Sequence, residues 1–277
     1  MPALPAAEAS LQARAVANVA EAFRRLTRHD PRGAIEEADG LTTIATSIPY
    51  PLFNAAFLER PVTDAEALAA RVRRFYARAG VPGLLLAEDA AAAERAAPLV
   101  HAAELAPGEP IPGMLLAPIP DPPRAPDGLD IRVVDDPDTL RVYNDTLAAV
   151  FGMPRAWLAV LDDPATLRLH DFAFYLGLLD GVPVGTSMRF TGHRIAGIYN
   201  VATLPTYRRR GIGAALTWRA AIDGRDEGCL ASALQASAEG FPVYARMGYC
   251  HVTDYQTWVI APTGASAEAT PAPGGQP

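Results

Sequence analysis

A cluster of prolines near the middle of the chain limits the folds open to it more than any other feature. Five prolines stand between Pro118 and Asp127. Proline has no amide hydrogen to donate and holds its backbone extended, so this segment suits neither a helix nor a central strand. The chain has 277 residues, half of them apolar, which is more than a single hydrophobic core usually takes. Residues 118–128 are therefore expected to link two domains, 1–117 and 129–260.

The second domain shows a regular succession of strand and helix patterns. Phe172 to Leu179 and Val182 to Phe190 flank Asp180-Gly181, a pair typical of a hairpin turn with positive φ. After Gly213, apolar residues recur at helical spacing until a glycine at 224 or 228. This order predicts an α/β domain of the α+β kind, a mixed sheet with helices on its faces. The other expected elements are strands at 129–134, 195–203, 231–236 and 249–259, and helices at 136–150 and 241–247.

The first domain has a less regular pattern that partly echoes the second. A hairpin is expected around Asp39-Gly40, within residues 33–48. The echo favours a tandem arrangement of two similar folds, although no sequence identity supports a duplication. The final segment, 261–277, contains no large apolar residue and is expected to be a disordered tail. The remaining expected elements are helices at 9–28, 64–78 and 90–101 and strands at 84–87 and 114–117.

Charge and hydropathy narrow the classes of partner. The formal net charge is -7, which argues against nucleic acid as a partner because phosphate backbones are bound by clustered positive charge. No run approaches the roughly 20 apolar residues of a membrane helix, and the N-terminus does not resemble a secretion signal. A cytoplasmic protein without a membrane partner is expected. Cys229 and Cys250 are expected to be two free thiols, with a disulfide as the alternative.

A short turn rich in arginine and glycine, Arg208 to Gly213, stands where a strand is expected to pass into a helix. Glycine allows an anion to approach the backbone amides, the helix dipole favours negative charge there, and arginine adds donors. The spacing matches neither a nucleotide P-loop nor a Rossmann turn. The turn therefore indicates a phosphate site, and an exposed basic turn that caps a helix is the alternative.

The stretch from Val201 to Leu216 closely resembles the signature of the GNAT acetyltransferase superfamily, Gln/Arg-x-x-Gly-x-Gly/Ala, with Arg208, Gly211 and Gly213 at its fixed places. Downstream, Leu234 to Tyr249 resembles the second element of that family, a strand followed by a helix with a tyrosine. The resemblance covers residues 129–260 and implies the GNAT fold there. Residues 40–54 resemble the first half of two-domain members, which implies a degenerate GNAT-like domain without a CoA site.

The resemblance also implies roles for individual residues. Tyr244 matches the tyrosine that protonates the CoA thiolate in many members, and a packed helix aromatic is the alternative. Ser237 would contact the coenzyme or Tyr244, unless it only makes a local turn. The implied binding residues for acetyl-CoA, or another acyl-CoA, are Val201, Ala202, Thr203, Arg208, Arg209, Arg210, Gly211, Ile212, Gly213, Ala214 and Ser237.

The general base is not evident from the sequence. Many relatives carry a carboxylate on the strand before the turn, whereas Ile195 to Thr203 offers only Tyr199 and Asn200 as large polar residues. A water relay or an acceptor amine of low pKa is an alternative to a protein base. Weaker candidates elsewhere in the domain are His170, Asp171, Glu239 and Asp254.

In the first domain, the region expected to match the phosphate turn is Leu84 to Ala90, which is acidic at the start of its helix and would repel phosphate. Pockets often form where domains meet, so this domain is a candidate wall of the acceptor site. Packing is the alternative role for its residues. The candidate substrate-binding residues of the whole chain are Tyr50, Phe53, Asn54 and Tyr199.

The function that follows is an acetyl-CoA-dependent N-acetyltransferase, in which the amine of a small molecule or an amino-acid-like acceptor attacks the thioester directly. No metal is required by this chemistry. The alternative is a non-catalytic module that binds or senses acyl-CoA. The sequence leaves open the acceptor, the acyl chain and the oligomeric state.

Overall fold

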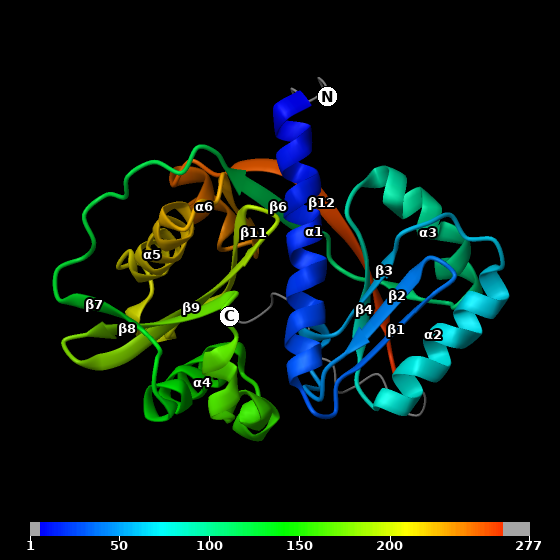
Figure 1. The fold of residues 1–277 in the computed structure, drawn as a ribbon, viewed down its shortest axis with the longest axis horizontal. Helices are drawn as coiled ribbons and strands as arrows, with labels where there is room; N and C mark the ends of the chain where they lie inside the picture. Colours follow the sequence, from blue (N-terminus) through cyan, green and yellow to red (C-terminus); the bar gives the residue numbers. More distant parts are fainter. Residues whose placement is uncertain (1–5, 263–277) are drawn as a thin grey trace. The chain divides into compact units, whose positions relative to one another are not determined.

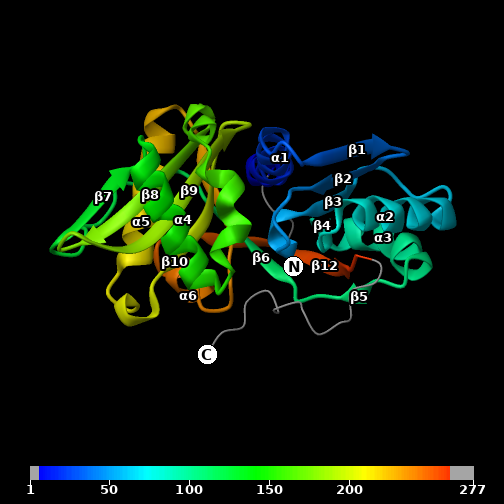
Figure 2. The ribbon, with the colours of Figure 1, turned by 90° about the horizontal axis from the view of Figure 1, so that it is seen from below.

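The computed structural model describes residues 6–262, so all but the first two residues of the expected tail, 261–277, lie outside the described part. Figures 1 and 2 show the course of the chain. The described residues form two compact units. Unit 1 consists of residues 6–19 and 113–252, and unit 2 of residues 20–112 and 253–262.

These units differ from the division expected from the sequence, because each contains a strand from the other half of the chain. Strand β6 (Ile111–Leu116) precedes the proline-rich segment, yet its residues from Gly113 onward pair with the sheet of unit 1. Strand β12 (Cys250–Ile260) ends the described chain and pairs from Gln256 onward with unit 2. Helix α1 (Ala6–His29) likewise begins in unit 1 and ends in unit 2.

Unit 1 contains a mixed sheet in the order β6-β11-β10-β9-β8-β7. Strands β10 and β11 are parallel, and the other neighbours are antiparallel. The expected mixed α/β fold is confirmed here. The elements of unit 1 are β7 (Leu129–Val133), α4 (Pro137–Phe151), β8 (Phe172–Leu179), β9 (Val182–Gly192), β10 (Ile195–Thr203), α5 (Ile212–Asp226), β11 (Ala231–Gln235) and α6 (Phe241–Arg246), with 3₁₀ turns at Arg155–Asp162, Pro164–Arg168 and Pro205–Tyr207.

The hairpin between β8 and β9 forms as the sequence predicts. Asp180 and Gly181 have φ angles of 51° and 81°, the positive values that a two-residue turn between twisted strands requires. Just before this turn, a bulge between Gly177 and Leu178 shifts the register of β8 against β9.

The two faces of this sheet are covered by different helices. On one side α5 buries Ile212 and Leu216, which lie against Gly185 of β9. On the other side Tyr143 of α4 packs edge-on against Phe174, with ring centroids 5.5 Å apart. The site is built on the strand that runs between these two layers, β10.

Unit 2 has a sheet in the order β1-β2-β3-β4-β12. Its β3 and β4 are parallel, and its other neighbours are antiparallel. This is the arrangement of β8-β9-β10-β11-β6 in unit 1, so unit 2 is a second, shorter version of that fold. Its elements are β1 (Ala34–Ala38), β2 (Leu41–Ala45), a 3₁₀ turn (Pro51–Phe53), β3 (Ala55–Leu58), α2 (Ala65–Ala79), β4 (Gly83–Ala87), α3 (Ala90–Ala102) and β5 (Ala106–Pro107).

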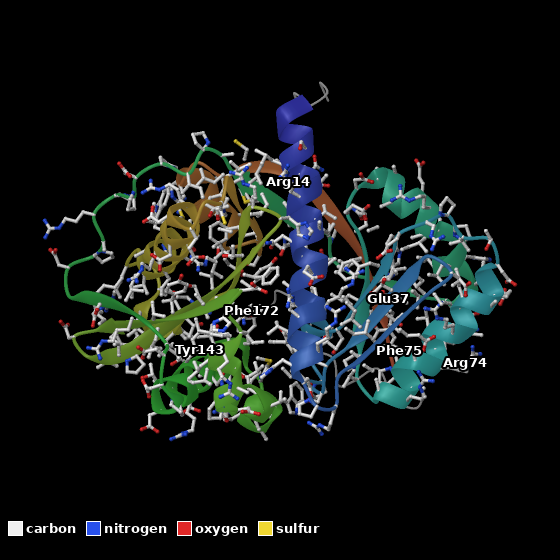
Figure 3. All side chains as sticks on the ribbon, in the orientation of Figure 1. Arg14, Glu37, Arg74, Phe75, Tyr143 and Phe172 are labelled. Atoms are coloured by element: carbon white, nitrogen blue, oxygen red, sulfur yellow. The ribbon has the colours of Figure 1, made fainter. Side chains whose placement is uncertain are left out.

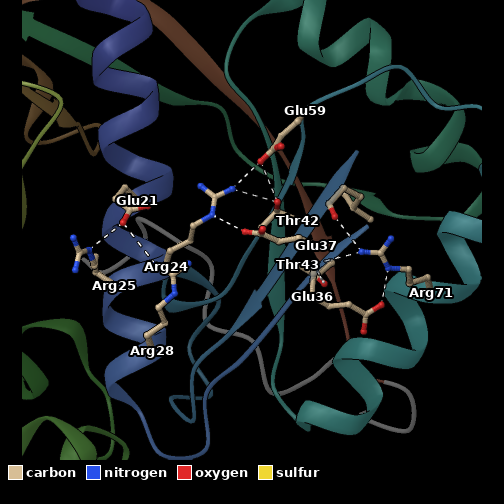
Figure 4. A network of polar contacts seen from close by, with 11 residues as sticks. Glu21, Arg24, Arg25, Arg28, Glu36, Glu37, Thr42, Thr43, Glu59 and Arg71 are labelled. Carbon is tan, nitrogen blue, oxygen red and sulfur yellow. Dashed lines mark hydrogen bonds and ion pairs between the residues drawn. The ribbon is translucent and has the colours of Figure 1, made fainter. Parts of the chain in front are cut away.

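A polar network attaches the second half of α1 to this sheet (Figure 4). The Arg24 guanidinium lies 2.9 Å from Glu37 and 2.7 Å from Glu59, and it also donates to the buried Thr42 hydroxyl. The Arg24 side chain is mostly buried, whereas Glu37 and Glu59 are about half exposed, so solvent screens these ion pairs in part. Its role is structural.

Candidate functional site

The arginine and glycine turn forms the start of helix α5. Arg209 and Gly211 both adopt left-handed backbone, with φ of 65° and 76°. Gly211 is the residue before the first helical turn, and no side chain caps the helix there. The first amides of a helix have no partner within the helix, so those of Ile212, Gly213 and Ala214 are donors for a ligand at this end.

Positive charge surrounds this helix start. Arg208, Arg209 and Arg210 are all exposed, and Arg208 Nε donates to the Thr203 carbonyl at 3.3 Å. The Arg210 guanidinium lies 5.4 Å from the centre of the Tyr207 ring. Together with the positive end of the helix dipole, the three guanidinium groups favour a polyanion.

Strand β10 leaves its parallel partner just before this turn. Its pairing with β11 ends at Ile198 and Leu234, whereas β10 continues to Thr203. A bulge interrupts its pairing with β9 between Tyr199 and Ala202, and Asn200 within the bulge has a φ of 53°. Among the strand pairs described, residues 199–203 have β9 on one side and no strand on the other.

The end of β10 and the start of α5 lie together. A Cβ atom added to Gly213 would lie 3.4 Å from Thr203 Oγ1 and 3.8 Å from Val201 Cγ1. The predicted coenzyme residues on the strand and on the helix are thus brought to one place. Since these distances are ordinary contacts, packing alone does not require glycine at position 213.

Tyr244 of α6 lies beside the same helix. Its side chain is 9% exposed. Burial raises the pKa of Tyr244 to about 12, and a contact with the Thr217 hydroxyl lowers it in part. Thr217 Oγ1 in turn donates to the Gly213 carbonyl at 2.9 Å, so Thr217 connects the phenol to the first turns of α5.

Ser237 is exposed and takes part in the turn before α6. Its Oγ accepts a hydrogen bond from the Gly240 amide at 3.1 Å. A Cβ at Gly240 would lie 2.9 Å from the Tyr244 ring. The turn therefore makes room for Tyr244, and contact of Ser237 with the coenzyme stays a prediction.

The weaker candidates for a base do not come together in one cluster. His170 and Glu239 are exposed and lie on separate loops, and Asp171 immediately precedes β8. Asp254 is exposed and lies in the part of β12 that belongs to unit 2. The structure gives none of them the place of a carboxylate on β10.

The first-half candidates belong to unit 2, where Asn54 secures a loop. Asn54 is fully buried, and its oxygen accepts from the Thr46 amide and hydroxyl at 2.7 and 3.0 Å. Its nitrogen donates to three backbone carbonyls, those of Ile48, Tyr50 and Pro82. The polar atoms of Asn54 are thus all bonded within unit 2, which fits the packing alternative, and contact of Asn54 with a substrate stays a prediction. Binding by Tyr50 and Phe53, whose rings pack 6.3 Å apart, stays a prediction.

The region of unit 2 that corresponds to the phosphate turn is not the one expected from the sequence. The helix that connects the parallel strands is α5 in unit 1 and α2 in unit 2. The counterpart of Gly211 is therefore the start of α2, at Asp64, and not Leu84 to Ala90. The Asp64 carboxylate accepts from the Ala67 amide at 3.0 Å, so it occupies a position that a phosphate would need.

Several residues around the bulge were missed by the sequence analysis. Asn18 of α1 is hydrogen-bonded to Tyr199. Tyr143 of α4 lies beside Asn200. Burial raises the pKa of Tyr143, and the contact with Asn200 lowers it in part. Tyr143 and Phe172, both labelled in Figure 3, each pack against the ring of Phe174. Asn18 has a sequence signal, because it falls on the buried helical stripe with Ala15, Val19 and Ala22.

Comparison with known proteins decides the family. The sequence profile of the family described as "Acetyltransferase (GNAT) family" matches residues 138–249. This part of the chain belongs to the GNAT family. The match includes the β10 bulge, the turn at the start of α5 and Tyr244. The comparison with characterised proteins gives no significant match along the sequence.

Solved structures show the GNAT fold over most of the chain. A GCN5-related N-acetyltransferase from Kribbella flavida is 19% identical, with a TM-score of 0.66 over 89% of this chain and 95% of that chain. A second, from Sphaerobacter thermophilus, is 16% identical, with a TM-score of 0.59 over 84% and 80%. A tandem GNAT protein from the clavulanic acid biosynthesis pathway is 13% identical, with a TM-score of 0.57 over 86% of each chain.

Within residues 6–262, no group of three or more His, Cys, Asp or Glu side chains is arranged to hold a metal ion. None of the helices in that range combines the length and apolar character needed to cross a bilayer. Cys229 is buried and Cys250 exposed, and both are free thiols, as expected.

Proposed function

We propose that the chain is an acetyl-CoA-dependent N-acetyltransferase that acts on the amine of a small or amino-acid-like molecule. Members of the GNAT family use acyl-CoA. The observation that carries the proposal is the uncapped start of α5, at Gly211, beside the end of β10, which has β9 on one side and no longer pairs with β11 on the other. We further propose that the enzyme works in the cytoplasm without nucleic acid or metal.

The two parts of this arrangement suit the two ends of the coenzyme. The amides of residues 211–214 and the arginines at 208–210 would bind the pyrophosphate. The edge of β10 at Val201 and Thr203 would pair with the amide groups of pantetheine as an added strand. The thioester would then lie near the bulge, where a backbone amide can polarise its carbonyl.

Tyr244 is suited to protonate the departing thiolate. A group that donates a proton has to hold it at the working pH, and burial raises the pKa of this phenol to about 12. The transfer is balanced: the amine nitrogen forms the new bond to the acyl carbon, the carbon–sulfur bond breaks, and the thiolate takes the Tyr244 proton. The amine loses its own proton to solvent or to a base.

Gly211→Asp tests the proposal, because it places a carboxylate where the pyrophosphate has to approach. CoA should raise the melting temperature of the wild type, as a ligand selective for the folded state does, and should leave that of the variant unchanged. Gly181→Asp is the matched control, since Gly181 has a similar φ of 81° and open space around it. A wild type without any CoA effect, or a folded Gly211→Asp that binds CoA normally, would refute the site.

One observation favours the alternative of a non-catalytic acyl-CoA sensor. Strand β10 carries no carboxylate along Ile195–Thr203. A thiol-release assay with a panel of amines separates the two functions. Thiol release that depends on an amine supports the enzyme, whereas CoA binding without turnover on any amine supports the sensor.

A further inference from the structure

A hydrogen-bonded pair connects α1 to the bulged strand within unit 1. The Asn18 amide is 1% exposed, and its nitrogen donates to the carbonyls of Phe190, Gly192 and Ile195 at 3.3, 3.0 and 3.1 Å. Its oxygen accepts the Tyr199 hydroxyl at 2.7 Å. Because carbonyl oxygens only accept, the amide nitrogen has to face them. The amide oxygen is therefore fixed toward Tyr199.

Gly197 makes room for this pair. A side chain at Gly197 would overlap Asn18 Oδ1 and would lie 2.7 Å from the Tyr199 hydroxyl. Gly197 and Tyr199 are two residues apart on β10 and share one face of the sheet. Tyr199 is also the last residue of β10 before the bulge, so the pair holds the phenol at the point where β10 has left β11.

The pair determines what Tyr199 can offer to another molecule. A phenol has one hydrogen, and here it is given to Asn18, so any further hydrogen bond at this oxygen is one that it accepts. An acceptor amine presents N–H groups that fit such an oxygen. Neither an amide nor a phenol takes up a proton at neutral pH. The pair can thus orient an uncharged amine but cannot deprotonate an ammonium ion.

We propose that Asn18 is a positioning residue of the acceptor site, which fixes Tyr199 as the hydrogen-bond acceptor for a weakly basic amine that arrives uncharged. This inference rests on the proposed function and adds the class of acceptor to it. It also explains why the first part of helix α1, up to Val19, belongs to unit 1 although it is far from β10 in sequence.

Other ionisable groups on the surrounding elements could also determine how the rate of transfer depends on pH. Helix α1 carries the half-buried Arg14, and the β9–β10 turn carries His193 and Arg194, both exposed. Tyr143 of α4 is buried, which raises its pKa. His170 and Asp171 precede the neighbouring β8, and Asp171 is the carboxylate among these groups. Asp171→Asn is therefore the control for a protein base.

The test measures thiol release from acetyl-CoA with glycinamide, a weakly basic amine, and with ethylamine, a strongly basic one. For the wild type, kcat/KM should rise with pH at a midpoint that follows the ionisation of each amine, so the two midpoints differ. Tyr199→Phe should raise the amine KM about tenfold, the loss of one hydrogen bond, with the acetyl-CoA KM unchanged. Tyr249→Phe, whose hydroxyl bonds to Ser232 at 2.7 Å in the core, is the matched control and should leave the amine KM unchanged.

Asn18→Asp adds a group that can take a proton behind Tyr199, and it should lower the pH midpoint for ethylamine. The same substitution removes the amide that donates to three carbonyls, and this loss can prevent folding. If Asn18→Asp does not fold, the Tyr199→Phe measurement alone tests the inference. Three results would overturn the inference. They are equal pH midpoints for the two amines, loss of the rise of kcat/KM with pH in Asp171→Asn, and an unchanged amine KM in Tyr199→Phe. A wild type that binds CoA but transfers to neither amine overturns it as well, whereas absent CoA binding would count against the proposed function itself.

Discussion

Helices α5 and α2 occupy the same place in the two units, since each connects the parallel strands of its sheet. The start of α5 has Gly211 in left-handed backbone, no side-chain cap and three exposed arginines. The start of α2 has the Asp64 carboxylate bonded to the Ala67 amide, with Glu66 in the first turn. The start of α5 is therefore open to an anion, whereas the start of α2 is already occupied by the Asp64 carboxylate.

The strands before these two helices also differ, in how far each continues past its last pair with the parallel strand. In unit 1, β10 runs from its last parallel pair at Ile198 through a bulge to Thr203. In unit 2, β3 ends at Leu58, one residue after its last parallel pair at Phe57. Before α2, the described part of unit 2 therefore has no counterpart of the strand edge that β10 presents before α5. We propose that these two local differences, a side-chain cap and a shorter strand, leave unit 2 without a coenzyme site.

The largest expected effect comes from separating the two halves of the chain. A fragment of residues 118–277 lacks β6, which pairs with β11 and buries Met114, Leu115 and Leu116. Each buried side chain of this size contributes about 1.5–3 kcal/mol, and the sum is comparable with the roughly 5–15 kcal/mol that stabilises a whole domain. Circular dichroism should show no cooperative unfolding of this fragment.

A fragment that begins at residue 111 retains β6 and is the control, which should recover part of the stability. If the fragment that begins at residue 118 unfolds as cooperatively as the full chain, the exchanged strands are dispensable. The two halves would then be independent domains, as the sequence alone suggested.

A smaller effect is expected at Tyr244, which faces α5 through Thr217. Tyr244→Phe keeps the ring and removes the acid, so kcat should fall by about 10- to 100-fold while CoA affinity stays unchanged. Steady-state kinetics with an accepted amine measures this, and Tyr249→Phe should retain the wild-type kcat. Full turnover of Tyr244→Phe, when chemistry limits the rate, would make Tyr244 a packing residue.

The smallest effect is expected from removing the cap in unit 2. Asp64→Ala should cost about 1 kcal/mol, the usual value of a lost helix cap, and should lower the melting temperature by about 2–4 °C. The thermal shift caused by CoA should stay the same as in the wild type. A change in CoA affinity would show that unit 2 contributes to the coenzyme site.

Local signals predicted most of the helices and strands of this fold and the turn at Gly211. Asp180-Gly181 and Asp39-Gly40 both form the expected turns, because a two-residue turn is determined by its own backbone. The turn at Gly211 was found for the same reason. Strand β3 was missed, since four residues next to prolines give too little alternation to recognise.

The missed features depend on contacts between distant parts of the chain. The exchange of β6 and β12 was not predicted, because each strand pairs with a partner that is distant in sequence and its own residue pattern does not specify that partner. Asn18 and Tyr199 are 181 positions apart, and no spacing rule connects them. Likewise, the match of Leu84 to Ala90 with the phosphate turn was wrong because only the strand directions show which helix joins the parallel pair.

Calorimetric titration of the full chain with CoA tests the central claim most directly, because it counts sites as well as measuring affinity. We expect one CoA bound per chain with micromolar affinity, and no binding to Gly211→Asp. Two CoA molecules per chain, or one that is retained in folded Gly211→Asp, would contradict the assignment of the coenzyme to α5 alone.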